Sequence, residues 1–106
     1  MDYRKVTAII QPSKLEAVEI RLKQISVPGV SVTKVKGYGQ VPNFFESDWT
    51  SAQARIEIFI AANKVDEVVQ AIMEVAYTGI KGDGIIAVLP VESLYHIRSG
   101  QLFDAD

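Results

Sequence analysis

Residues 53–61 read QARIEIFIA, and this stretch decides the fold class. Every second residue is apolar, and these residues would share one buried face: Ala54, Ile56, Ile58 and Ile60. The intervening Gln53, Arg55 and Glu57 fall on the opposite, exposed face. Strict alternation of this kind is typical of a half-buried β-strand. We therefore expect a strand over 53–61.

A helix and another strand are expected after this stretch. Asn63 is suited to cap a helix, and apolar residues then recur at helical spacing over 65–76. Thr78-Gly79 is a typical helix end. The run 85–89 is apolar at every position and predicts a strand that could lie in the middle of a sheet. Pro90 is expected to terminate that strand.

The residues before 53–61 predict a second strand–helix–strand unit. Residues 5–10 are rich in Val, Ile and Thr and indicate a strand. Ser13 and Glu16 form a capping-box pattern, which opens a helix. The apolar face of that helix would be Leu15, Val18, Leu22 and Ile25. Residues 30–36 alternate and indicate a half-buried strand.

The order of these elements predicts one α+β domain over 1–106 with a ferredoxin-like, split βαβ (βαββαβ) fold. Both helices would pack on one face of the sheet. The other face includes the apolar run 85–89, which must also be covered. A small domain commonly covers such a face by forming an oligomer, so we expect one here.

Composition excludes several classes of function. The 106 residues contain no cysteine, which excludes disulfides, thiolate metal sites and cysteine nucleophiles, and the single histidine argues against a metal site. The formal net charge of −2 gives no electrostatic reason to expect nucleic acid as a partner. No signal-like core or membrane-spanning apolar run is present, and we expect a cytoplasmic protein.

Two glycine-rich segments are candidates for anion binding. Gly37-Tyr38-Gly39 stands where a strand runs into a long loop, and Gly82-Asp83-Gly84 stands between a helix and a strand. Such turns let backbone N–H groups approach a phosphate. Taken alone, each segment is more simply a strand exit or a tight turn. Together they favour a nucleotide or a similar anion at an edge of the sheet.

Two further segments carry candidate residues. In the tail 95–98, alternation puts His96 and Arg98 on the same side, and Arg98 is suited to contact a phosphate or carboxylate. His96 would assist only when protonated. The loop 37–51 holds Phe44, Phe45 and Trp49, which either anchor a partner or fold back onto the subunit. No catalytic triad can be assembled around the single histidine.

Several segments in the right order resemble the PII signalling superfamily, the relatives of the nitrogen regulatory proteins. They cover residues 6 to about 101: Ala8-Ile9-Ile10-Gln11-Pro12, residues 32–39, Arg55-Ile56-Glu57-Ile58, residues 78–86 and Ile97-Arg98-Ser99-Gly100. The resemblance implies a homotrimer that binds adenine nucleotides in clefts between subunits. It also implies that the loop at about 38–52, the T-loop, contacts a target protein.

The resemblance also assigns residues to the nucleotide cleft. Gly37, Tyr38 and Gly39 would lie at the phosphates, Gly82, Asp83 and Gly84 would form the second wall, and Arg98 would contact a phosphate. Ser31, Glu57 and the backbone near Phe59 would lie by the adenine and ribose. The predicted nucleotide-binding set is completed by Ile9, Gln40 and His96.

Departures from the family pattern affect the expected ligands. Where typical members carry a glutamine and a lysine for magnesium and 2-oxoglutarate, this chain has Val41 and Gln53. Ile85 and His96 also replace cations. The loop is short, and 40–51 has no tyrosine to be uridylylated. We therefore expect ADP or AMP to be favoured over ATP, with bicarbonate as a co-ligand by analogy with carboxysome and inorganic-carbon-associated members.

Four other interpretations remain open from the sequence, one of which is a structural or amino-acid-binding regulatory module. The chain could be a nitrogen-regulating member that senses 2-oxoglutarate, or a regulator associated with a metal-efflux pump. It could also be a small acylphosphatase-like enzyme that uses Arg98, although no water-positioning residue is evident. We expect the chain to be a regulatory protein rather than an enzyme.

Overall fold

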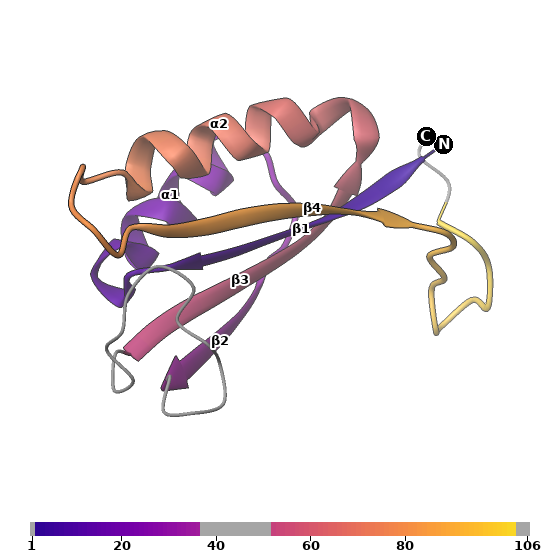
Figure 1. Cartoon of the computed structure of the whole chain (residues 1–106). Coiled ribbons are helices and arrows are strands. Elements are labelled where there is room, and N and C mark those ends of the chain that lie inside the picture. The colour runs from indigo at the N-terminus through magenta and orange to yellow at the C-terminus, as the bar shows by residue number, and fades with distance from the viewer. Residues whose placement is uncertain (1, 37–51, 104–106) are drawn as a thin grey trace.

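The computed structural model describes residues 2–36 and 52–103, and the elements follow the predicted order (Figure 1). The strands are β1 (Tyr3–Ile10), β2 (Ser31–Lys36), β3 (Ala52–Ala61) and β4 (Gly84–Val91). The helices are α1 (Leu15–Gln24) and α2 (Val65–Ala76), and each is preceded by a short 3₁₀ turn, at Pro12–Lys14 and Ala62–Lys64.

The four strands form one antiparallel sheet in the order β2-β3-β1-β4. Both helices cover the same face of this sheet (Figure 1), as the ferredoxin-like prediction requires. The register pairs Ile10 of β1 with Ala54 of β3 and with Gly84 of β4. The fold class predicted from the alternation of 53–61 is thus confirmed.

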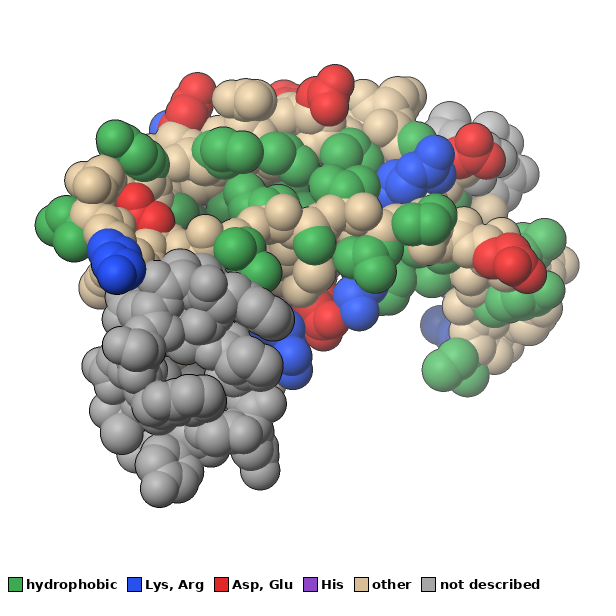
Figure 2. Space-filling model, in the orientation of Figure 1, with side chains coloured by type: hydrophobic (Ala, Val, Ile, Leu, Met, Phe, Trp, Pro, Cys, Tyr) green, Lys and Arg blue, Asp and Glu red, His purple; other side chains and the backbone are tan. Residues whose placement is uncertain are grey.

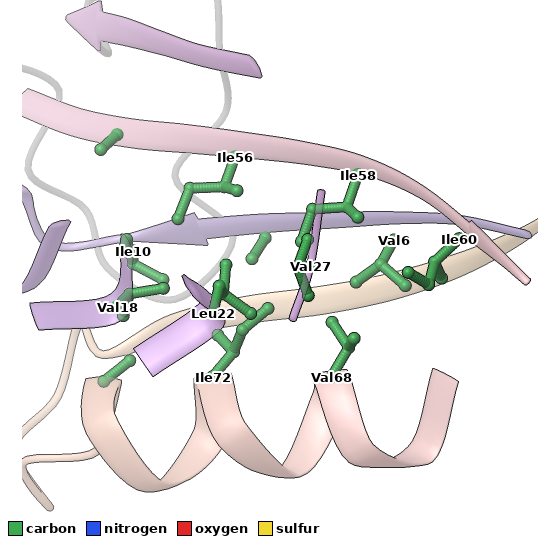
Figure 3. Close-up of a cluster of buried hydrophobic side chains, with 13 residues drawn as sticks. Val6, Ile10, Val18, Leu22, Val27, Ile56, Ile58, Ile60, Val68 and Ile72 are labelled. Atoms are coloured by element: carbon green, nitrogen blue, oxygen red, sulfur yellow. The ribbon is translucent and has the colours of Figure 1, made fainter. Parts of the chain in front are cut away.

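The core lies between the helices and the sheet (Figure 3). Alternate residues of β1 and β3 point into it, including Val6, Ile56 and Ile58, each no more than 1% exposed. Leu22 of α1 and Ile72 of α2 meet them from the helix side. The alternation and the helical spacing in the sequence both arise from this single buried layer.

Both predicted helix caps are wrong in detail. No side chain caps either α-helix. The 3₁₀ turns before them take the place of a cap, and at the first one the Lys14 amide donates to the Gln11 carbonyl over 2.9 Å. Ser13 and Asn63 therefore mark where the helical segments begin without supplying the capping hydrogen bond.

The predicted place of the apolar strand is also corrected. β4 is at an edge of the sheet in this chain, and it continues through Pro90 to Val91. Proline is tolerated there because an edge strand need not donate every N–H to a neighbour. Ile85, Val88 and Leu89 are 39–45% exposed on this strand. Figure 2 shows hydrophobic side chains gathered over this part of the surface.

The tail after β4 is a tight reversal rather than the extended segment that was predicted. Tyr95 bridges to Leu102, and the His96 amide donates to the Gln101 carbonyl over 2.8 Å. A turn lies between them, so the alternation argument that put His96 and Arg98 on one side does not hold. The His96 ring instead stacks on Phe103, with ring centroids 3.6 Å apart.

Candidate functional site

One end of the sheet gathers the boundaries of both predicted anion-binding segments. Lys36 pairs with Ala52 where β2 and β3 flank the long loop, and Ile10 pairs with Gly84 where β4 begins. The predicted residues Gly37, Tyr38, Gly39 and Gln40 lie outside the described residues, as do Val41 and the loop aromatics. The strands that lead into and out of that loop nevertheless meet it at the same end of the sheet as Gly82-Asp83-Gly84, although β2 and β4 are opposite edge strands.

The turn between α2 and β4 is built around glycines in the left-handed region of backbone space. Gly82 has φ of +100° and Gly84 has φ of +113°. At Gly84 an added Cβ would lie 1.9 Å from the carbonyl oxygen of Ile9. Only glycine lets this strand start so close to the end of β1. Ile9, predicted as a cleft residue, therefore lies directly beside the turn.

Asp83 points into the turn and holds its two sides together. Its carboxylate accepts the Thr78 amide over 2.9 Å and the Gly79 amide over 3.0 Å, and it also accepts the Thr78 hydroxyl. Hydrogen bonds from Thr78, first from its hydroxyl and then from its amide, hold the pKa of Asp83 below its ordinary value of 3.8. Asp83 is therefore an internal anion of this segment.

Two residues that are distant in sequence act on this turn, and the sequence analysis did not predict them. The Gln11 side-chain amide donates to the Gly82 carbonyl over 3.3 Å. The charge of Lys14 contributes to lowering the pKa of Asp83. Gln11 follows β1 directly and Lys14 ends the 3₁₀ turn after it, and the antiparallel pairing of β1 with β4 places this segment beside the turn. The strand order, once known, is the signal that would have found them.

The predicted adenine and ribose residues lie on the face of the sheet that the helices leave open. Ser31 pairs with Glu57 in the β2–β3 register, and Phe59 follows on the same face of β3. Glu57 forms an ion pair with Lys5 at 2.7 Å, and Phe59 is 49% exposed. Gln53, expected on an exposed face, is buried at 7% exposure. The open face therefore carries polar groups that are already partly removed from water.

The Lys5–Glu57 pair predicts a pH dependence of stability. The hydrogen bond from Lys5 lowers the pKa of Glu57 from its ordinary 4.5, against the raising effect of burial. A depressed carboxyl pKa stabilises the folded state above the unfolded pKa, and this contribution is lost as pH falls through the folded pKa. We expect Glu57→Gln to be less stable than wild type by up to about 1 kcal/mol at neutral pH. This difference should shrink below the ordinary pKa of the group, about pH 4.5.

Urea unfolding at a series of pH values measures this difference. Glu92→Gln is the matched control, because Glu92 is exposed and has no ion pair within the described residues. A Glu57→Gln protein whose stability relative to wild type is the same at pH 3.5 as at pH 7 would contradict the assignment.

The remaining predicted residues, His96 and Arg98, lie at the opposite end of the sheet. They follow the end of β4, whereas Gly82 and Asp83 precede its start (Figure 1). A strand of eight residues spans roughly 24 Å. One subunit therefore brings the loop base and the glycine turn to one end of the sheet and keeps Arg98 away from them. Each end holds half of the predicted anion site.

The described residues hold no cluster of three or more side chains suited to bind a metal ion. Within the same ranges, no helix has the length and apolar character needed to cross a membrane. The turn before β4 offers backbone amides and nearby lysines. The reversal closed by the Tyr95–Leu102 bridge, which we call the hairpin, offers the guanidinium of Arg98. These groups can recognise an anion.

An antiparallel four-stranded sheet with two helices on one face and a glycine-rich turn at one end is a ferredoxin-like α+β architecture. Residues 3–101 match the family model described as "Nitrogen regulatory protein P-II". The chain belongs to the PII nitrogen regulatory protein family, whose proteins are signalling regulators.

Similarity to individual members extends over nearly the whole chain. It is 38% identical over 105 residues to the P-II protein of Microchaete diplosiphon, covering 92% of this chain and 94% of that protein. It is 36% identical over 107 residues to GlnK of Escherichia coli, covering 94% and 96%. A crystal structure of Arabidopsis thaliana PII bound to citrate superposes with a TM-score of 0.80 at 32% identity, covering 96% of this chain and 86% of that one.

Proposed function

We propose that this chain is a PII-type signal sensor that binds adenine nucleotides in clefts between the subunits of a homotrimer. The proposal rests on the distance between two groups of predicted binding residues, which we call half-sites. One is the glycine turn before β4, and the other is Arg98 beyond the far end of β4. In a single subunit they cannot hold the same small anion. Between neighbouring copies, the turn of one and the hairpin of the next can meet.

The surface of the chain supports assembly. β4 is an edge strand of the described sheet with exposed apolar residues, and neither helix covers the opposite face of the sheet (Figure 1). Such an edge is a template for contact with another chain. Burying Ile85 and Leu89 against a second copy would remove apolar area from water, which favours association.

ADP or AMP is the proposed ligand in preference to ATP. The turn presents Ile85, an apolar residue, directly after Gly84, and the hairpin presents His96 where a second cation would serve a triphosphate. Each missing charge-assisted contact is worth about 1.5–3 kcal/mol. Bicarbonate is the proposed co-ligand, and a transporter or enzyme of inorganic-carbon uptake is the proposed target of the loop at about 38–52.

A nitrogen-regulating function is the second candidate, because the relatives are named for it. Against 2-oxoglutarate sensing stand two neutral residues at positions where typical members bind it, Val41 and Gln53. Gln53 is also buried, at 7% exposure. The two candidates differ in the small molecule that should change nucleotide affinity.

Titration calorimetry separates these candidates. AMP, ADP and ATP are each titrated alone, with bicarbonate, and with magnesium and 2-oxoglutarate, on protein whose mass in solution is measured by light scattering. We expect a trimer that binds ADP or AMP at least tenfold more tightly than ATP, which corresponds to about 1.4 kcal/mol, with affinity changed by bicarbonate. Magnesium-dependent 2-oxoglutarate binding without a bicarbonate effect would instead establish the second candidate. A monomer, or no nucleotide binding, would overturn both.

A further inference from the structure

We infer that Asp83 is a positioning residue that pre-forms the anion-binding turn and does not itself contact the ligand. This inference rests on the proposed nucleotide function and deepens it. The observation behind it is the direction of the carboxylate, which faces the N-terminal side of its own turn and accepts donors from Thr78 and Gly79.

The hydrogen bonds form a closed ring across the turn. Thr78 donates both its amide and its hydroxyl to Asp83, and the same hydroxyl accepts the Ile80 amide over 3.1 Å. Gly79 adds a third donor to the carboxylate. The six residues from Thr78 to Asp83 that this ring spans are thus held by one side chain. A short polar side chain that bonds the nearby backbone in this way substitutes for regular secondary structure.

The same ring divides the amides of the turn into two groups. The amides of Thr78, Gly79 and Ile80 are consumed inside it. The amides of Lys81 and Gly82 have no acceptor among the residues that the structure describes. Because Gln11 draws the Gly82 carbonyl toward the end of β1, the ring and this contact fix the peptide on both sides of Gly82. The amides of Lys81 and Gly82 are therefore not used by the ring and are available to an incoming anion.

The charges agree with this division. A carboxylate directed at a phosphate would repel it, whereas three donors and the nearby charge of Lys14 compensate the carboxylate of Asp83 here. Lys14, whose charge acts on Asp83, and the exposed Lys81 add positive charge to this region. Asp83 supports anion binding by holding donors in place, although it carries the same sign of charge as the ligand.

Variants of the ring separate positioning from direct contact. Asp83→Asn weakens the ring, Thr78→Val removes its hydroxyl, and Thr78→Ser retains that hydroxyl as the conservative variant. Asp66→Asn makes the same chemical change on the exposed first turn of α2 and is the matched control. Affinities for ADP and for adenosine, which lacks phosphate, are measured by titration. Amide hydrogen exchange of Thr78 and Gly79 is measured in the ligand-free protein.

We expect Asp83→Asn and Thr78→Val to weaken ADP binding by about tenfold or more, with adenosine affinity changed by less than about twofold. Amide exchange at 78 and 79 should accelerate in both variants, and Thr78→Ser and Asp66→Asn should behave as wild type. Full ADP affinity in Thr78→Val, or weakened binding in Asp83→Asn with unchanged exchange, would overturn the inference. Wild-type protein that binds no ADP would instead remove the proposed function, and this role of Asp83 with it.

Discussion

Gly84→Ala is expected to lower the free energy of unfolding by about 3 kcal/mol or more. The new Cβ would lie 1.9 Å from the Ile9 carbonyl oxygen and 2.9 Å from its carbonyl carbon. Both are backbone atoms of the central strand pair, so no side-chain rotation can relieve the overlap. The φ of +113° adds backbone strain for any residue with a Cβ.

Relief of the clash requires β4 to move away from β1 at the end that carries the anion-binding turn. Stability and ligand binding should therefore fall together in Gly84→Ala. Thermal unfolding at fixed protein concentration should show a midpoint lower by about 10 °C or more. Gly29→Ala is the matched control, because an added Cβ there meets nothing within 4 Å. A Gly84→Ala protein as stable as Gly29→Ala would mean that β1 and β4 do not approach each other as described.

The fold was predictable because the residues that each strand or helix buries recur in the sequence at the spacing of that element. Ile56 and Ile58 alternate with polar neighbours since only one face of β3 meets the helices, and Val68 and Ile72 repeat at helical spacing for the same reason. The position of β4 was not predictable in this way. An apolar run fits a central strand and also an edge strand that another chain covers, and both leave the same pattern.

The candidate site was predictable in its glycines and not in its supporting contacts. Gly82 and Gly84 identify a turn of unusual backbone conformation, whereas Gln11 reaches Gly82 from 71 residues away through the strand order. The prediction of an extended segment over Tyr95 to Arg98 was wrong for a different reason. Alternation over so short a segment cannot distinguish a strand from a turn, and the reversal is fixed by the contact of His96 with Gln101.

The second large effect, a loss of ADP affinity, is expected when Arg98 is replaced. The experiment asks whether Arg98 acts in a cleft of its own subunit or in one shared with the next subunit. Arg98→Ala should weaken ADP binding by about tenfold to 150-fold, the loss of one charge-assisted contact of about 1.5–3 kcal/mol. Gly82→Val should do the same from the other half-site, because a β-branched side chain is strained at φ of +100° and crowds the free amides. Neither change touches the buried core, so both proteins should fold.

Mixed assemblies of the two variants then decide where the half-sites meet. If the turn of one subunit works with Arg98 of its neighbour, refolding equal amounts of Arg98→Ala and Gly82→Val together should restore about one cleft in four, counted as tight ADP sites by calorimetry. Refolding the double variant with an equal amount of wild type is the control and should also leave about one cleft in four. If both halves belonged to one subunit, the first mixture would restore none and the second about half. The two stoichiometries therefore distinguish a site between subunits from one within a subunit, independently of the absolute affinity.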